Sequence, residues 1–96
     1  MIHEHSLVAV TPDQVACEMQ GELLILQTAS GIYYGLDPVG KLVWDQMTEP
    51  KPVGGIRDAL LAEYEVDRGT CTRDLVALLE ELASKRLIGV SPAPVA

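Results

Sequence analysis

Hydrophobic positions follow two different periods along the chain. Residues 15–20 alternate, with one set of alternate positions formed by Val15, Cys17 and Met19, which favours a half-buried strand. The apolar run 23–26 and the segment 32–36 favour two more strands, and the turn residues Gly21-Glu22 and Ala29-Ser30-Gly31 separate the three. These short segments predict an antiparallel meander. Residues 5–10 can form a further short strand, which the turn residues Thr11-Pro12-Asp13 would end.

After residue 37 the apolar residues recur every three or four positions, as on one face of a helix. A helix is predicted from Pro38 to about Met47, capped by Asp37, because Pro suits the first helical position. Two more helices are predicted at 53–64 and about 71–86, the last capped by Thr70 or Thr72. Residues 87–90 are expected to be extended.

The element order is therefore three strands followed by three helices. It predicts an α+β domain, with a small three-stranded antiparallel sheet packed on three helices. Segment 32–36 is expected to be an edge or near-edge strand. Residues 1–90 are expected to form the domain, and residues 91–96 a flexible C-terminal tail.

Size and charge exclude several classes of protein. The chain has 96 residues, and its 14 acidic and 7 basic side chains give a net charge of −7. Seven acids and one base fall in residues 1–50, which leaves the second half close to neutral. A general nucleic-acid-binding protein needs a basic face, so none is expected. No apolar run is long enough to span a membrane, and no secretion signal precedes the domain, so a soluble cytoplasmic protein is expected.

Catalysis is not expected, because the sequence has no nucleophile motif and no phosphate-binding glycine loop. The two histidines, His3 and His5, lie in an N-terminal segment that is expected to fray. A disordered terminus is therefore favoured over a metal site at these residues. Cys17 and Cys71 lack metal-ligand spacing and are expected to be ordinary thiols. No cofactor and no metal are expected.

Peptide binding is the better candidate. A small sheet leaves unpaired backbone groups along its edge, and such an edge can receive an extended peptide as an added strand. Tyr33 offers aromatic surface for this, and Gly35 allows a close backbone approach. Periodicity favours a core position for Tyr34, on the face of the strand opposite to Tyr33.

One stretch carries a family resemblance. Residues 31–47, Gly-Ile-Tyr-Tyr-Gly-Leu-Asp-Pro-Val-Gly-Lys-Leu-Val-Trp-Asp-Gln-Met, resemble the pattern G-x-Y-[YF]-x-L-[ND]-x-x-G-x-x-[VI]-W-x-x-[LM] of the PqqD-like family. Apolar positions in 56–67, 74–82 and 87–88 are also similar. The resemblance covers roughly residues 7–90. It implies a winged-helix-turn-helix-like domain that recognises leader peptides of ribosomally made, post-translationally modified peptides.

A free-standing chain of this length resembles the separate recognition element of split lasso-peptide systems. The resemblance implies two partners, the precursor's leader peptide and a separate cysteine leader peptidase. It also implies that the leader pairs antiparallel to segment 32–36 and lies between that strand and the third helix. The implied contacts are Ile32, Tyr33, Tyr34, Gly35 and Leu36 on the strand, and Leu75, Val76, Leu79, Glu80, Ala83 and Arg86 on the helix, with Leu79 shared between core and groove.

The chain departs from the family pattern at the end of the third helix. The family often has Lys-Gly-Leu there, and this chain has Lys85-Arg86-Leu87. Arg86 could close the helix or reach an acidic leader residue. Three alternative functions stay open. One is a peptide chaperone of pyrroloquinoline-quinone synthesis, and another is a scaffold for the peptidase that makes no contact with the leader. The third is a winged-helix DNA-binding regulator, against which the balanced charge of the third helix argues.

Overall fold

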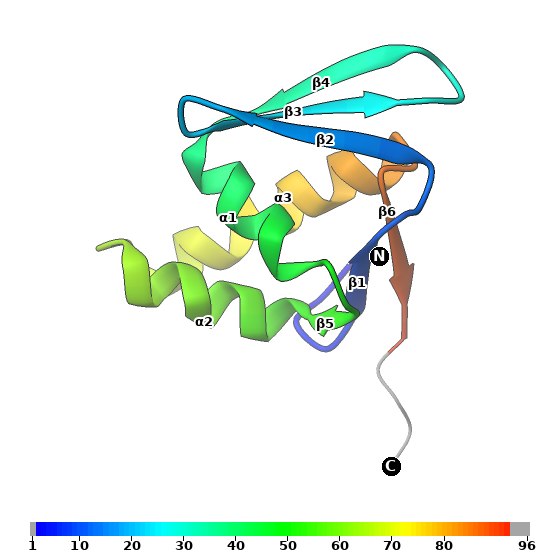
Figure 1. Cartoon of the computed structure of the whole chain (residues 1–96). Coiled ribbons are helices and arrows are strands. Elements are labelled where there is room, and N and C mark those ends of the chain that lie inside the picture. Colours follow the sequence, from blue (N-terminus) through cyan, green and yellow to red (C-terminus); the bar gives the residue numbers. More distant parts are fainter. Residues whose placement is uncertain (1, 93–96) are drawn as a thin grey trace.

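The structure, a computed structural model, describes residues 2–92 and contains two small sheets and three helices (Figure 1). Their order and bounds are β1 (Leu7–Val10), β2 (Gln14–Met19), β3 (Glu22–Gln27), β4 (Ile32–Leu36), α1 (Pro38–Gln46), β5 (Lys51–Pro52), α2 (Val53–Glu63), α3 (Arg68–Ser84) and β6 (Ile88–Ser91).

The predicted meander is confirmed as the sheet β2-β3-β4, with both strand pairs antiparallel. Its first turn is Gln20-Gly21, one residue earlier than expected, and both residues have positive φ, 54° and 82°. Such a two-residue turn matches the twist of the paired strands. β4 pairs only with β3 among the described strands, so the expected edge position is also confirmed.

The helices pack on one face of this sheet and leave the other face open within residues 2–92 (Figure 1). Leu23 and Ile25 of β3 are buried on the helix side, and their β4 partners Leu36 and Tyr34 are half-buried there. The half-buried character expected for β2 was wrong: Val15 and Met19 are both 59% exposed. They face away from the helices, and α1 contacts β3 and β4, so β2 projects beyond the packed region.

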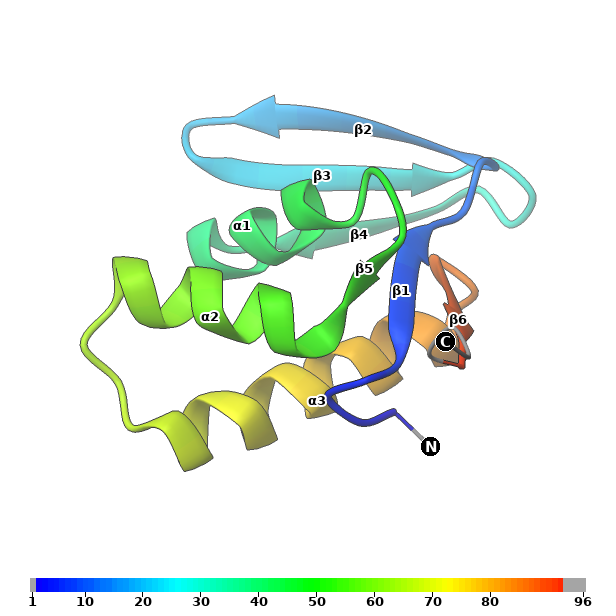
Figure 2. The same cartoon turned by 90° about the horizontal axis from the view of Figure 1, so that it is seen from below.

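A second sheet, β5-β1-β6, lies beside the helices (Figure 2). The expected early strand is confirmed as β1, and residues 87–90 contribute to its partner β6. β6 continues to Ser91, which pairs with Leu7, so the first residue of the expected tail belongs to a strand. Residues 93–96 of that tail lie outside the described residues.

The helix starts follow local hydrogen bonds. Asp37 caps α1 as predicted, because its carboxylate accepts the Gly40 N–H at 2.8 Å. α3 begins at Arg68, earlier than predicted, and its cap is Asp67 instead of a threonine, since the Asp67 carboxylate accepts the Thr70 N–H at 3.0 Å. The shift reflects the stronger acceptor, a charged carboxylate against a hydroxyl.

The N-terminal segment docks on α2, which corrects the expectation of fraying. Ile2 is buried, the Gly54 N–H donates to the Glu4 carbonyl at 2.9 Å, and Arg57 Nη1 lies 2.8 Å from Glu4 Oε2. The carboxylate hydrogen bond from Arg57, together with the charge of His5, lowers the pKa of Glu4. Burial of this segment comes from tertiary contacts that no local pattern reveals.

One apolar core joins both sheets and all three helices, and it includes Trp44, Met47, Ile56, Leu79 and Leu87. With β1 and β6 beside the helices, the arrangement confirms the expected α+β, winged-helix-turn-helix-like fold.

Candidate functional site

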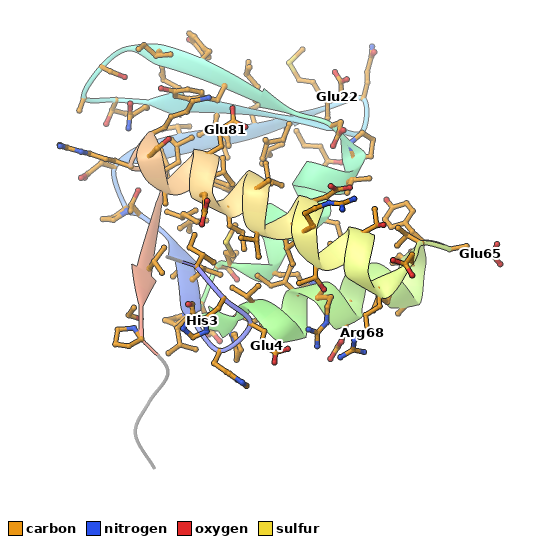
Figure 3. All side chains as sticks on the ribbon, turned by 180° about the vertical axis from the view of Figure 1, so that it is seen from behind. His3, Glu4, Glu22, Glu65, Arg68 and Glu81 are labelled. Carbon is orange, nitrogen blue, oxygen red and sulfur yellow. The ribbon has the colours of Figure 1, made fainter. Side chains whose placement is uncertain are left out.

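A groove of about 510 Å³ runs between the free edge of β4 and α3. We call it the edge groove. Its lining residues come from β4, the start of α1 and the second half of α3: Tyr33, Tyr34, Gly35, Leu36, Asp37, Val39, Gly40, Leu78, Glu81, Leu82 and Lys85. Glu81 lies on the part of α3 nearest the β2-β3-β4 sheet (Figure 3).

The strand wall of the groove offers unpaired backbone groups. In an antiparallel pair, the N–H and C=O groups of alternate residues point away from the partner strand. On β4 those groups face the groove side, because β3 occupies the opposite edge. An extended chain lying in the groove can therefore pair with β4 as a fourth strand.

Charged and aromatic groups meet at one end of the groove. Lys85 Nζ lies 2.8 Å from Glu81 Oε1 and 5.1 Å from the centre of the Tyr34 ring. Tyr34 is half-buried against the core and also lines the groove. Periodicity predicted the core position, and the family resemblance implied the groove position. This end of the groove can bind a polar or charged group of a ligand. Farther along the groove, Leu78 and Leu82 form an apolar wall.

The other end is fixed by the start of α1. A Cβ on Gly40 would lie 3.0 Å from the Leu36 Cβ, so the glycine lets the helix approach the end of β4 closely. Gly35 is different, because a Cβ there would meet nothing within 4 Å. The fold does not itself require glycine at that position.

The structure brings together four of the five predicted strand residues, Tyr33 to Leu36. Ile32 is 50% exposed and lies outside the groove lining. Tyr33 is 61% exposed, so its ring can be covered by a ligand without disturbing the core.

The structure places the six predicted α3 residues elsewhere. Leu75 and Leu79 are buried in the core, Val76 and Ala83 pack partly against it, and Glu80 and Arg86 are exposed outside the lining. The groove face of α3 is formed instead by Leu78, Glu81, Leu82 and Lys85. These positions also follow the i, i+3, i+4, i+7 spacing of a helix stripe, so periodicity could have found them. Choosing between neighbouring stripes required the packing angle of the helix.

The open face of the β2-β3-β4 sheet is mostly apolar. We call it the outer apolar face, and cross-strand pairing assigns to it Val15, Cys17, Met19, Leu24, Leu26 and Tyr33, with Glu22 opposite Met19 at one end. Val15, Met19 and Tyr33 are each about 60% exposed (59%, 59% and 61%). Contiguous exposed apolar surface of this kind marks an interaction site on many proteins.

Within residues 2–92, no group of three or more metal-ligating side chains gathers in one place. His3 and His5 are neighbours, with ring centres 6.1 Å apart, and both are exposed. No helix of the described part is long and apolar enough to cross a membrane.

Comparisons with known proteins agree with this geometry. The family model described as coenzyme PQQ synthesis protein D (PqqD) matches residues 22–88. A solved structure, "TbiB1 in Complex with the TbiA(beta) Leader Peptide", is 39% identical with a TM-score of 0.78, and the match covers 83% of this chain and 93% of that chain. No curated protein matches significantly.

A second solved structure, "Lasso peptide synthetase B1 complexed with the leader peptide", shares the fold at a TM-score of 0.77. It is 22% identical, and the match covers 85% of this chain and 96% of that one. The family match spans β3 through the start of β6 and thus the whole edge groove. Together with the 39% identity to TbiB1, it shows that this chain belongs to the PqqD family.

Proposed function

We propose that this protein is a non-catalytic adaptor that binds the leader peptide of a ribosomally made precursor, a lasso-peptide precursor, and delivers it to a separate cysteine leader peptidase. The observation that carries the first part is the edge groove: a free strand edge with a helix wall below it. The similarity to TbiB1, whose solved complex contains a leader peptide, supports the choice of ligand.

Backbone pairing with β4 would fix the direction and register of the leader. Side chains alternate on a strand, so one set would enter the groove against Leu78 and Leu82, and the other would lie beside Tyr33. The first set provides selectivity and the backbone provides affinity that depends little on sequence. Because a flexible leader must be ordered on binding, a Kd of about 10⁻⁸–10⁻⁶ M is expected.

The net charge of −7 supports a leader that carries Lys or Arg. Electrostatic attraction would accelerate association at low salt more than it would tighten binding. Asp37, Glu81 and Lys85 line the groove, and Lys85 pairs with Glu81, so the charged groups of the lining sum to −1.

The outer apolar face supports the delivery step. A leader added to β4 would extend this face by one strand, so a protein docked there would contact both chains. Holding the leader on a surface shared with the peptidase raises the leader's effective concentration at that enzyme. A cleavage assay tests this: adding the adaptor should accelerate leader removal, and Val15→Asp in the outer apolar face should abolish the gain without changing leader affinity.

A chaperone role in pyrroloquinoline-quinone synthesis is the second candidate, because the matching family model carries that description. Titration with the precursor peptide of that pathway distinguishes the two. DNA binding has less support, since Arg73 in α3 lies near Asp74, and Lys85, which caps the C-terminus of α3, lies near Glu81.

The decisive experiment is calorimetric titration with two probes, the TbiA(beta) leader peptide and the leader of the precursor encoded beside this chain's gene. Tyr33→Ala should weaken binding by about 1–3 kcal/mol, as expected for a central aromatic contact, with little loss of stability. The matched control is Val15→Ala, equally exposed on the same face but on β2.

One-to-one binding that Tyr33→Ala weakens and Val15→Ala does not would support the adaptor function. If the folded wild-type protein bound neither leader, the leader-recognition proposal would fail. If both substitutions weakened leader binding equally, the leader would bind at a site other than β4.

A further inference from the structure

β2 forms the second free edge of the β2-β3-β4 sheet, opposite the edge groove. Among the described strands it pairs only with β3, and seen from below all three helices lie on the β3 side of it (Figure 2). Edge strands are usually short, or carry Lys, Pro or a bulge that prevents pairing with another chain. β5 is of this kind, with only Lys51 and Pro52. β2 has six residues, none of them Lys or Pro, and an unbroken register with β3, so its edge is open to strand addition.

The turn after β2 determines which of its backbone groups face this edge. Met19 and Glu22 flank the two-residue turn, so they form a pair that exchanges both backbone hydrogen bonds. From Met19 backwards, the groups of every second residue therefore point to β3. The Asp13 carbonyl, next in that series, accepts the Thr28 N–H from the end of β3 and agrees with this pattern. The residues whose N–H and C=O groups point outward are Gln14, Ala16 and Glu18.

These outward groups suit a second copy of the same strand. If two copies of β2 run antiparallel about a twofold axis at Cys17, Ala16 of one lies opposite Glu18 of the other, and their outward groups exchange hydrogen bonds. On the outer apolar face, this register places Val15 opposite Met19, both 59% exposed. Glu18 is the one charged side chain of β2, and its carboxylate lies 3.6 Å from Lys41 Nζ of its own chain. No like charges are therefore brought directly opposite each other.

We propose that this protein forms a homodimer by antiparallel pairing of two β2 edges, which joins the two three-stranded sheets in the order β4-β3-β2-β2-β3-β4. The twofold axis is perpendicular to the sheet, so both outer apolar faces lie on one side, and both β4 edges stay free at the ends. A contact of one strand per copy is small against the roughly 1,200–2,000 Å² of a stable interface, so the dimer depends on concentration. The proposal goes beyond leader recognition and does not depend on it.

Sedimentation equilibrium, from micromolar to millimolar protein, tests the proposal. The wild-type protein should pass from monomer to dimer as its concentration rises. Added salt should strengthen the dimer, because each copy has a net charge of −7 and the two repel each other. Salt should have the opposite effect on association with a basic leader peptide.

Two substitutions in β2 should keep the protein monomeric, with the fold verified by circular dichroism. Ala16→Pro removes an outward N–H and leaves the hydrogen bonds to β3 in place, as proline does on natural edge strands. Cys17→Lys places like charges opposite each other at the twofold axis. The matched control is Val90→Lys on β6, which adds the same charge at an exposed valine (43%) and should not weaken the dimer.

Amide hydrogen exchange assigns the contact to one edge of β2. Exchange at Ala16 and Glu18 should slow as the protein concentration rises, because their N–H groups become paired in the dimer. Exchange at Val15 and Cys17 should not change, since their N–H groups bind β3 in both states.

Oxidative cross-linking tests the register. Opposed residues at a non-hydrogen-bonded position have Cα atoms about 4.5 Å apart, within the reach of a disulfide. Diamide should therefore join two copies through Cys17: the two thiols form one S–S bond and give two protons and two electrons to diamide. Cys17→Ser retains only the buried Cys71 and should not cross-link. Val90→Cys added to that variant should cross-link far more slowly than wild type.

Three outcomes would overturn the proposal. One is a protein that stays monomeric at millimolar concentration. Another is a dimer that Ala16→Pro leaves intact, with unchanged exchange at Ala16 and Glu18, because the copies would then meet through another surface, such as stacked outer apolar faces. The third is a dimer that saturating leader peptide dissociates, which would assign the contact to β4. A dimer with these β2 signatures and no affinity for leader would support this proposal and remove only the leader-recognition one.

Discussion

At the scale of single residues, Arg86 shows how the chain departs from its family pattern. Its φ is 61°, in the left-handed region that favours glycine. The Leu87 N–H donates to the Leu82 carbonyl at 3.0 Å, which closes α3 in the way a terminal glycine usually does. Of the two roles left open by the sequence, closing the helix is the one the structure shows.

Arg86→Gly should therefore raise the free energy of unfolding by up to about 1 kcal/mol, since it relieves this conformation. Urea unfolding measures the change, and Arg86→Ala, which keeps a Cβ, should give no gain. Leader affinity should stay within twofold because Arg86 does not line the edge groove. A tenfold loss in both variants would instead assign Arg86 a direct contact with the leader.

Trp44 is buried in the core, 6% exposed. Trp44→Ala should lower the free energy of unfolding by about 3–5 kcal/mol, because it removes a large apolar side chain and leaves a cavity. Chemical denaturation measures this, with Trp44→Phe as the milder control. A stable Trp44→Ala protein that still binds leader would contradict the core assignment.

At the scale of elements, the width of the edge groove depends on what holds β4 and α3 together. Gln27, at the end of β3, donates from Nε2 to the Lys85 carbonyl at 2.7 Å. Thr11 and Gln14 donate to the Leu87 carbonyl just beyond. Side chains of β2, β3 and the β1-β2 turn thus satisfy the carbonyls of Lys85, at the C-terminus of α3, and of Leu87, just after it.

Gln27→Ala should cost about 1 kcal/mol of stability and also weaken leader binding, because the end of α3 loses its tie to the β3-β4 hairpin. Thr28→Ala is the control: it removes a hydrogen bond to the Asp13 carbonyl, which does not involve α3. Paired denaturation and calorimetry should show similar losses of stability but a loss of affinity in Gln27→Ala alone. If both variants bound the leader with equal affinity, the hydrogen bond from Gln27 to Lys85 would not determine the width of the groove.

At the scale of the whole molecule, we expect the docked N-terminal segment to make stability depend on pH. The pKa of Glu4 is lowered in the folded state, chiefly by the Arg57 hydrogen bond. A lowered folded-state pKa contributes stability that is complete above the unfolded value, about 4.3, and is lost as pH falls through the folded value. Wild type should therefore be more stable than Glu4→Gln at pH 7, and the difference should shrink below about pH 4.

Denaturation of both proteins between pH 3 and 7 measures this difference. Amide exchange at Gly54, whose N–H binds the Glu4 carbonyl, reports the local opening. A difference that stayed constant across this range would show that the Glu4 carboxylate does not hold the segment.

Local patterns determined much of this protein. The meander, the three helices, the Asp37 cap and the core position of Trp44 follow from periodicity and turn chemistry, because each depends on residues close in sequence. The edge position of β4 and the exposed Tyr33 followed in the same way. The second sheet did not, since β1, β5 and β6 are brought together by pairings between residues 43 to 84 positions apart in the sequence.

Only the tertiary structure decided which stripe of α3 faces the groove. Leu75 and Leu79 and their neighbours Leu78 and Leu82 have equivalent helical spacing, and the rotation of α3 against β4 selects between them. Tertiary structure also decided the environment of β2. Its apolar and polar residues alternate as the sequence shows, but the apolar residues face away from the helices. The hydrophobic period of a segment shows which of its residues share a face. Which other element covers that face depends on how the whole chain packs.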